Sequence, residues 1–555
     1  MRAAWIWLAV IVLPWSATPI GSQVTEPRIG PSLSAASNFS QGRQDGMFRL
    51  VRALGLADLR DGMTWSRVET APGMYRFDNH RTRYPAQLAD TTIGVVLNWG
   101  NPLYDGGATP VSDEALGAFG RYAAALIEQY PNIENLEIGN EINGVNFVRG
   151  PMREMAPLER ARAYTRMIIA AAEAAKAVRP DIRIVGGATH SLPGAFLWEV
   201  LDAGGAEVMD AIAVHPYTTP AEQLQRQFAV LRRHPDAARL PFEVTEFGTP
   251  DPDQAAAHFV RNYCQMALSS VTRVAWYPLN RRGDGMIPIF EPDGRLTGAG
   301  RALRLIQSRM EGRPVRDIAP DPFTYGCQFG DDTAVLWGVP RAIEGIDGLE
   351  LRAADGSVVE AAAFDEATPL ILIGDDPVAQ IRLAGQTRLA DSFHQFSYPD
   401  PGDETRDTDG FERFILHKGS VIAFETRPGQ DARGTPWYPY LGVPRFRPMR
   451  LTAENMVPGV VGGSPAEIVH RYVASEDVIA NLTARFAVGE RSEDGIVVTV
   501  LLDGDVLVER DGIGEIEVLL PGLPLAAGAA LDIIVGPKDS ARGDVVQYRL
   551  ILDRG

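Results

Sequence analysis

The sequence is poor in the side chains that hold most protein-bound metals. Its 555 residues include only 2 cysteines and 8 histidines. No HExxH or comparable spacing brings histidines together as zinc ligands, and two cysteines are too few for a zinc cluster. These residues therefore predict no zinc site. We further expect a protein that uses neither a metal nor an organic cofactor.

The two cysteines, Cys264 and Cys327, lie in different kinds of predicted structure. Cys264 falls in a helix-like stretch and Cys327 in a strand-like one. Export from the cytoplasm would permit a disulfide, but sequence separation does not fix the geometry that a disulfide needs. We favour two buried free thiols and leave pairing open.

The chain also lacks an excess of positive charge. It has 53 Lys and Arg against 71 Asp and Glu, a formal net charge of −18. Such a balance argues against nucleic acid or an anionic membrane surface as the partner. It favours a soluble protein acting on a neutral or weakly charged substrate, and it does not predict an oligomeric state.

No apolar run is long enough for a membrane span, which needs about 20 residues. Residues 1–23 read MRAAWIWLAVIVLPWSATPIGSQ, with one arginine, an apolar run from Ala3 to Leu13 and then small residues. This pattern is typical of a secretory signal peptide; an uncleaved anchor is the alternative. We expect a secreted or periplasmic protein without a membrane span in the mature chain.

Residues 24–310 alternate short apolar runs with longer helical patterns, which predicts a (β/α)8 TIM barrel. A doubly wound sheet is the competing arrangement, but GPSLSAASNF after the first run has no G-x-G-x-x-G phosphate turn. The eight predicted strands are Arg28–Leu33, Ala57–Met63, Thr92–Asn98, Leu136–Glu141, Ile182–Gly187, Ala211–His215, Phe242–Glu246 and Arg273–Tyr277.

Helical periodicity largely stops after Met310, and short β-like runs bounded by turn residues follow. We predict a β-sandwich accessory domain over residues 311–428, a Pro- and Gly-rich linker over 429–449, and a second β-sandwich over 450–555. The last domain is either a carbohydrate-binding module or a structural spacer.

Two predicted strands end on a glutamate. NLEIGNEIN carries Glu141 at the end of the fourth strand, and FEVTEFG carries Glu246 at the end of the seventh. In a TIM barrel the C-terminal strand ends surround the active site. Two carboxyl groups about 5 to 5.5 Å apart there suit retaining glycoside hydrolysis. We expect their mutual repulsion to raise the pKa of one and keep it protonated.

These stretches resemble glycoside hydrolases of clan A. IGNEIN resembles the WNEP-type acid/base motif and VTEFG the TEFG-type nucleophile motif. LGLADLRDGMTWSRVETAPGMYRFD, VVLNWGNPLYDGG, VHPYTTP and VAWYPL follow in the same linear order as in family 39-like enzymes of the exopolysaccharide endoglycosidase and β-xylosidase types. The resemblance spans about residues 28 to 310. Gly139 and Ile142 depart from it, standing where the family has Trp and Pro.

The resemblance implies roles for individual residues. Glu141 would be the general acid/base and Glu246 the nucleophile. Asn140 would bind the sugar 2-hydroxyl, and Trp276 would form the apolar floor of the sugar subsite. The other residues expected near the substrate are Arg60, Asn98, Asn101, Tyr104, His190, His215 and Tyr217; for His190 a loop-capping role is an equal alternative.

The predicted function is therefore an exported retaining glycosidase that cleaves O-glycosidic bonds of an oligo- or polysaccharide by double displacement. The alternatives are a barrel that binds glycan without cleaving it, and a transglycosylase that uses the same covalent intermediate. The sequence predicts neither the sugar and linkage nor whether cleavage is endo or exo.

Overall fold

The computed structural model describes residues 28–43, 46–400 and 409–555. The predicted signal peptide lies outside these residues. Within them, none of the helices combines the length and the apolar character that crossing a membrane requires.

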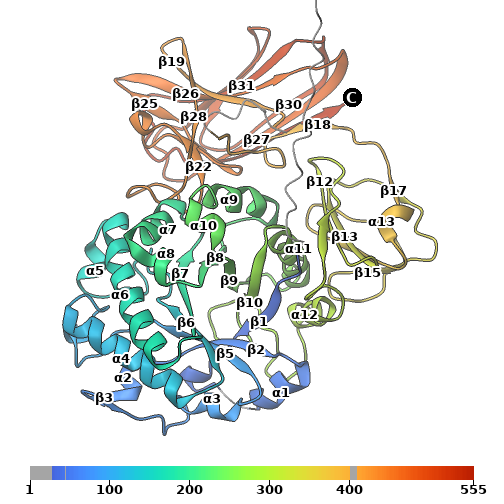
Figure 1. The fold of residues 1–555 in the computed structure, drawn as a ribbon. Helices are drawn as coiled ribbons and strands as arrows, with labels where there is room; N and C mark the ends of the chain where they lie inside the picture. The colour runs from blue at the N-terminus through green and yellow to red at the C-terminus, as the bar shows by residue number, and fades with distance from the viewer. Residues whose placement is uncertain (1–27, 44–45, 401–408) are drawn as a thin grey trace, which may run out of the picture.

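Eight parallel strands close into a barrel in the order β1-β10-β9-β8-β7-β6-β5-β2, with helices around it (Figure 1). The predicted TIM barrel is confirmed. Its strands are β1 (Ser32–Ala36), β2 (Asp58–Gly62), β5 (Thr92–Leu97), β6 (Ile133–Ile138), β7 (Arg183–His190), β8 (Ala211–His215), β9 (Phe242–Phe247) and β10 (Val271–Trp276). The first strand begins four residues later than Arg28, and the fourth ends three residues before Glu141.

The surrounding helices form where the sequence supplies start signals and apolar faces. In α4 (Asp113–Gln129), the N-cap Ser112 accepts a hydrogen bond from the amide of Ala115 (3.2 Å), and Asp113 and Glu114 complement the helix dipole. The other main helices are α1 (Met47–Leu54), α6 (Pro157–Val178), α7 (Gly194–Val200), α9 (Leu224–Leu231), α11 (Ala255–Leu268) and α12 (Gly298–Arg309).

Antiparallel sheets follow the barrel, as predicted. A five-stranded sheet of order β11-β12-β13-β16-β15 packs beside α11, and two larger sheets form a sandwich over the barrel (Figure 1). The five strands are β11 (Val315–Asp317), β12 (Thr324–Phe329), β13 (Thr333–Gly338), β15 (Glu350–Arg352) and β16 (Leu370–Ile373). The long sandwich strands are β26 (Ser464–Val473), β27 (Val478–Val488), β28 (Ile496–Leu502), β29 (Asp505–Gly512), β30 (Gly514–Leu525), β31 (Ala530–Pro537) and β32 (Val546–Arg554).

The sheets divide the chain differently from the predicted boundaries at residues 428 and 450. β18 (Arg388–Asp391) pairs with β32, and β19 (Glu412–His417) pairs with β26. β22 (Tyr440–Gly442), inside the predicted linker, is a further strand of the sandwich. Strands from about residue 388 onward therefore belong to the C-terminal sandwich, because pairing between distant segments decides sheet membership.

Cys264 and Cys327 form a disulfide, so the favoured interpretation as free thiols is wrong. Cys264 lies on α11 and Cys327 on β12, with their Cα atoms 6.0 Å apart. The packing of the five-stranded sheet against α11 brings them together, and this contact has no local sequence signal. The bond ties the barrel to the first antiparallel sheet.

Removing this crosslink should destabilise the protein. The disulfide joins residues that are 63 positions apart in the sequence. Closing a loop of that length lowers the chain entropy of the unfolded state, which stabilises the fold by about 4 kcal/mol. We expect the Cys264→Ala/Cys327→Ala variant to unfold at a clearly lower urea concentration than the oxidised wild type. Reduced wild-type protein is the matched control and should resemble the variant; coincident unfolding curves for oxidised protein and variant would contradict the crosslink.

Candidate active site

The structure brings Glu141 and Glu246 together at the C-terminal end of the barrel. One carboxylate oxygen of each lies within 4.8 Å of the other. Both side chains are largely buried, with 15% and 13% of their surface exposed. The two carboxylates therefore face the same small region at the mouth of the barrel.

The backbone at Glu141 turns sharply to aim this side chain. Gly139 has φ 83° and Glu141 φ 48°, a left-handed conformation that costs a non-glycine residue about 1–3 kcal/mol. The amide of Glu141 donates to the carbonyl of Ala188 (2.6 Å) and holds the turn. A Cβ at Gly139 would lie 2.6 Å from Ile142 and 2.9 Å from Tyr164. Glycine is therefore required where the resembled family has Trp.

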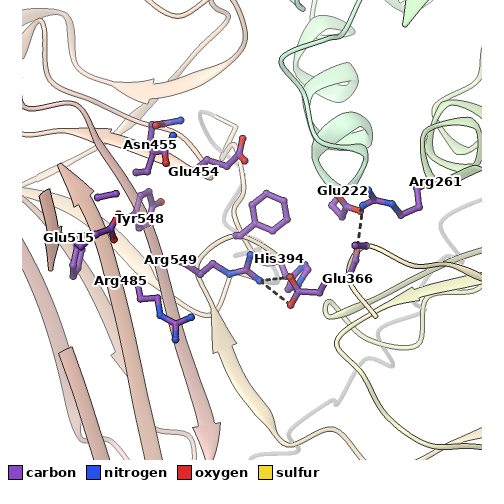
Figure 2. A pocket seen from close by; sticks show the side chains of 15 residues that line it. Glu222, Arg261, Glu366, His394, Glu454, Asn455, Arg485, Glu515, Tyr548 and Arg549 are labelled. Atoms are coloured by element: carbon purple, nitrogen blue, oxygen red, sulfur yellow. Dashed lines mark hydrogen bonds and ion pairs between the residues drawn. The ribbon is translucent and has the colours of Figure 1, made fainter. Parts of the chain in front are cut away.

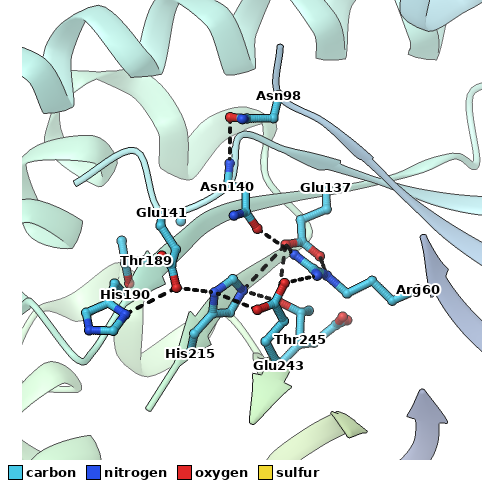
Figure 3. Close-up of polar contacts among 12 residues, drawn as sticks. Arg60, Asn98, Glu137, Asn140, Glu141, Thr189, His190, His215, Glu243 and Thr245 are labelled. Atoms are coloured by element: carbon cyan, nitrogen blue, oxygen red, sulfur yellow. Dashed lines mark hydrogen bonds and ion pairs between the residues drawn. The ribbon is translucent and has the colours of Figure 1, made fainter. Parts of the chain in front are cut away.

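Two histidines contact the carboxylate of Glu141 (Figure 3). Its Oε1 lies 3.2 Å from Nδ1 of His190 and 3.3 Å from Nδ1 of His215. Burial alone would raise the pKa of Glu141, but the hydrogen bonds from His190 and His215 outweigh it and lower the pKa to about 2. The pKa of Glu141 is thus shifted opposite to the rise expected from mutual repulsion, because the hydrogen bonds from His190 and His215 stabilise its ionised form.

The pKa of His215 is shifted in the opposite direction to that of Glu141. Burial would lower the pKa of His215, but the charge of Glu246 and hydrogen bonds to Glu137 and Glu141 raise it to about 9. Its ring nitrogens lie 3.8 Å from Glu137, 3.3 Å from Glu141 and 4.0 Å from Glu246. At neutral pH a buried imidazolium therefore sits among three carboxylates.

Glu246 is held from two sides. The hydroxyl of Tyr217 donates to Oε2 of Glu246 (3.1 Å), and the guanidinium of Arg60 donates to its Oε1. Arg60 also forms an ion pair with Glu137 (2.6 Å) and donates to Oδ1 of Asn140 (3.0 Å). These contacts fix the orientation of the carboxylate and compensate its charge.

Asn98 and Asn140 lie at the same cavity as Glu246. The backbone amide of Asn140 donates to Oδ1 of the Asn98 side chain (3.0 Å), as Figure 3 shows. Both side chains line a cavity of about 590 Å³ together with Arg60 and Glu246. Trp99 lines it as well, a residue that sequence reasoning missed although it directly follows Asn98.

Three predicted contact residues lie elsewhere. Asn101 and Tyr104 are buried and both donate to Glu69. The side-chain amide of Asn101 donates to its backbone carbonyl (2.8 Å), and the hydroxyl of Tyr104 donates to its Oε1 (2.8 Å). Trp276 has 0% of its surface exposed, stacks on Phe259 and packs in the core, so no sugar can reach it.

Glu141, His215 and Glu246 each offer one atom that could ligate a metal. The raised pKa of His215 and the guanidinium of Arg60 already place positive charge among these carboxylates. A cation would have to displace that proton and compete with that arginine. The arrangement is therefore better suited to proton transfer than to metal binding.

A larger cavity, about 680 Å³, lies away from these carboxylates, where the barrel meets the C-terminal sandwich. Figure 2 shows Glu222 and Arg261 on its barrel side and Arg549 across from them, with Glu366 between, where Arg261 donates to its carbonyl (3.1 Å). Arg549 forms ion pairs with Glu366 (3.3 Å) and with the buried Asp391 (2.7 Å). Arg261 also pairs with Glu222 (2.7 Å), and because these pairs join separate parts of the chain we interpret this cavity as part of the contact between domains.

Comparisons with known proteins bear on the fold. No protein-family model matches the sequence, and no curated protein matches it. A solved family 39 glycoside hydrolase from the gut symbiont Bacteroides cellulosilyticus WH2 superimposes with a TM-score of 0.52 at 19% identity, covering 62% of this chain and 81% of that one. The chain shares the fold of a family 39 glycoside hydrolase. A family 39 β-xylosidase from Caulobacter crescentus matches with a TM-score of 0.45 at 16% identity, over 64% of this chain and 98% of that one.

Proposed function

We propose that the protein is an exported, retaining glycoside hydrolase of the clan A type, resembling family 39, that cleaves an oligo- or polysaccharide. The observation that carries this proposal is the approach of Glu141 and Glu246 to within 4.8 Å at the C-terminal mouth of the barrel. The shared fold agrees with it, and the sequence around both residues resembles the family motifs.

In the first step Glu246 attacks the anomeric carbon as the bond to the leaving oxygen breaks, and a glycosyl ester forms on Glu246. Glu141 donates a proton to that oxygen, so a neutral alcohol departs. In the second step Glu141 takes a proton from water, the water oxygen bonds to the anomeric carbon, and Glu246 is released as a carboxylate. Asn140, at the same cavity, would bind the sugar 2-hydroxyl.

The proton for the first step resides on His215 in the free enzyme. Nδ1 of His215 lies 3.3 Å from Oε1 of Glu141, so a short transfer converts Glu141 into the acid. A bound sugar excludes water from the site and disfavours the separated charges of the pair, which promotes this transfer.

The pH dependence should report this proton. Since the pKa of His215 is raised to about 9, the proton is present below that pH and lost above it. We expect kcat/KM to fall on the alkaline side near pH 9. The protonated imidazole also stabilises the fold. This contribution to the free energy of unfolding is complete below the ordinary pKa of 6.5 and is lost as the pH rises through about 9.

The variant His215→Gln should move the alkaline limb of the pH profile down by more than one pH unit, because Glu141 must then retain the proton alone. His234→Gln, at a largely buried histidine that pairs with the exposed Asp202 (3.1 Å) instead of with the two glutamates, is the matched control. An alkaline limb unchanged in His215→Gln would contradict the assignment of the proton to this residue.

The function itself is tested by incubating the purified protein with a panel of aryl glycosides and polysaccharides and recording the NMR spectrum of the first-formed sugar. The proposal predicts hydrolysis with retention of the anomeric configuration. Inversion would overturn the mechanism, and binding without cleavage across the panel would favour a glycan-binding barrel.

A further inference from the structure

Residues 428–438, which begin at the end of the predicted accessory domain and continue into the predicted linker, form a strap that is bound to the rim of the barrel. The amides of Gly194 and Ala195 donate to the carbonyls of Pro428 (2.8 Å) and Gly429 (3.1 Å). The buried side chain of Gln430 accepts from Nδ2 of Asn143 (3.0 Å) and donates to the carbonyl of the same residue (2.8 Å). The C-terminal sandwich thus contacts the loop that follows Glu141.

Ion pairs at the base of the strap keep its conformation fixed. Asp431 accepts hydrogen bonds from Arg427 (2.7 Å), Arg447 (2.7 Å) and the hydroxyl of Tyr440 (2.9 Å). A side chain presented by this strap is therefore already ordered before any ligand binds, which reduces the entropy cost of binding.

The strap presents Trp437 beside the acid/base residue. The Trp437 ring meets the ring of His190 edge-on, with centroids 5.5 Å apart, and His190 in turn contacts Glu141 (3.2 Å). A Cβ at Gly144 would lie 3.4 Å from the indole, so the ring packs closely over that loop. Yet 38% of Trp437 remains exposed, and an exposed indole offers a flat apolar face to a sugar ring.

A cavity of about 430 Å³ adjoins Trp437 and shares no lining residue with the cavity of Glu246. Asn140 lines the cavity of Glu246, and Asn143 lines the one beside Trp437. Trp437 contacts His190, which in turn contacts Glu141, so the second cavity lies on the side of the acid/base residue. In a retaining glycosidase the acid/base residue protonates the leaving oxygen, and we therefore assign the cavity beside Trp437 to the leaving sugar.

The charge of this second cavity is positive, unlike that of the whole chain. Arg153, Arg160 and Arg433 line it, with Glu154 as the single carboxylate. Within the described ranges none of the three arginines forms an ion pair; Arg160 donates to backbone carbonyls, including those of Asn143 and Gly144, and Arg433 donates to the carbonyl of Glu154 (2.7 Å). Arg160 is buried and its donors are taken by backbone carbonyls, whereas Arg153 and Arg433 are exposed at the cavity. Exposed guanidinium groups without a carboxylate partner favour a carboxylate ligand.

We propose that Trp437 and the cavity lined by Arg153 and Arg433 form a leaving-group subsite that takes a sugar bearing a carboxylate, such as a uronate. The inference rests on the proposed function for the direction of cleavage. It refines the expectation of a neutral or weakly charged substrate, because local charge rather than net charge acts at contact distance.

The subsite can be tested by binding alone, in the Glu246→Gln variant of the full chain labelled with 5-fluorotryptophan. The probes are the methyl glycosides of glucuronate, galacturonate and mannuronate and their three neutral counterparts. The ¹⁹F signal of Trp437 is identified by its loss in the Trp437→Phe variant. We expect at least one uronide to shift this signal, and to reach half of the full shift at a concentration at least tenfold lower than its neutral counterpart needs.

The double variant Arg153→Gln/Arg433→Gln should weaken uronide binding at least tenfold, whereas Arg445→Gln, an exposed arginine outside the cavity, should leave it unchanged. A Trp437 signal that no uronide shifts, or that neutral sugars shift equally, would overturn the inference. If wild type hydrolyses glycosides in that case, the proposed function stands without this subsite. Uronide binding without any turnover would instead refute the assignment as a leaving-group subsite.

Discussion

Glu246→Gln is expected to lower kcat by a factor on the order of 10⁴ or more, since an amide cannot form the glycosyl ester on which double displacement depends. The substitution keeps the shape of the side chain, and Tyr217 can still donate to its remaining oxygen. The fold should therefore be retained. The measurement is kcat with the best aryl glycoside, together with the thermal unfolding midpoint.

Glu134→Gln is the matched control for this variant. Glu134 lies on β6 with its side chain exposed, so the same chemical change there should leave turnover within a factor of two of wild type. If the Glu246→Gln protein keeps a tenth or more of wild-type kcat, Glu246 is not the nucleophile.

Glu141→Ala is expected to slow cleavage of glycosides with poor leaving groups by about 10²–10⁴, the usual contribution of general acid catalysis. Substrates with a dinitrophenolate leaving group need no proton, so their first step should proceed. Azide should then accelerate turnover and yield a glycosyl azide, since it attacks the glycosyl ester without help from a base. Rates with graded leaving groups, with and without azide, check this expectation.

The result that would contradict this role is an equal loss across all leaving groups with no azide product. The effect must also be separated from damage to the site, because Glu141→Ala removes the carboxylate that both His190 and His215 contact. Glu141→Gln retains a group of the same shape and should show the same dependence on leaving group.

The pattern of the sequence was sufficient to predict the barrel and its two carboxylates. Parallel strands buried on both faces are continuous apolar runs, and each of the eight predicted runs overlaps a barrel strand. The glutamates follow or end two of these strands, where barrel geometry makes side chains converge. Local periodicity, strand length and motif together fix these features, so no knowledge of distant contacts was needed.

Side-chain direction at the strand ends was less predictable. Trp276, expected as the sugar platform, points into the core, whereas its neighbour Tyr277 lines the cavity of Glu246. A change of one residue moves a strand side chain to the opposite face. The irregular pairing between β9 and β10 shifts the register near Trp276, and no sequence pattern reveals such an irregularity.

Contacts between distant segments account for the remaining differences. The disulfide between Cys264 and Cys327 depends on how a sheet packs on the barrel, and Trp437 reaches the site only because residues 428–438 bind the barrel rim. The pKa of Glu141 depends likewise on two histidines from other strands. Such features depend on tertiary packing, which composition and periodicity do not predict.

The most direct measurement is to trap the covalent intermediate and locate it. The 2-deoxy-2-fluoro glycosyl fluoride of the sugar found active in the aryl glycoside panel should inactivate the enzyme and add one sugar mass. Peptide mapping by mass spectrometry should place that mass on Glu246. A label on a different residue, or efficient turnover that forms no adduct and releases the inverted anomer, would contradict the double-displacement account.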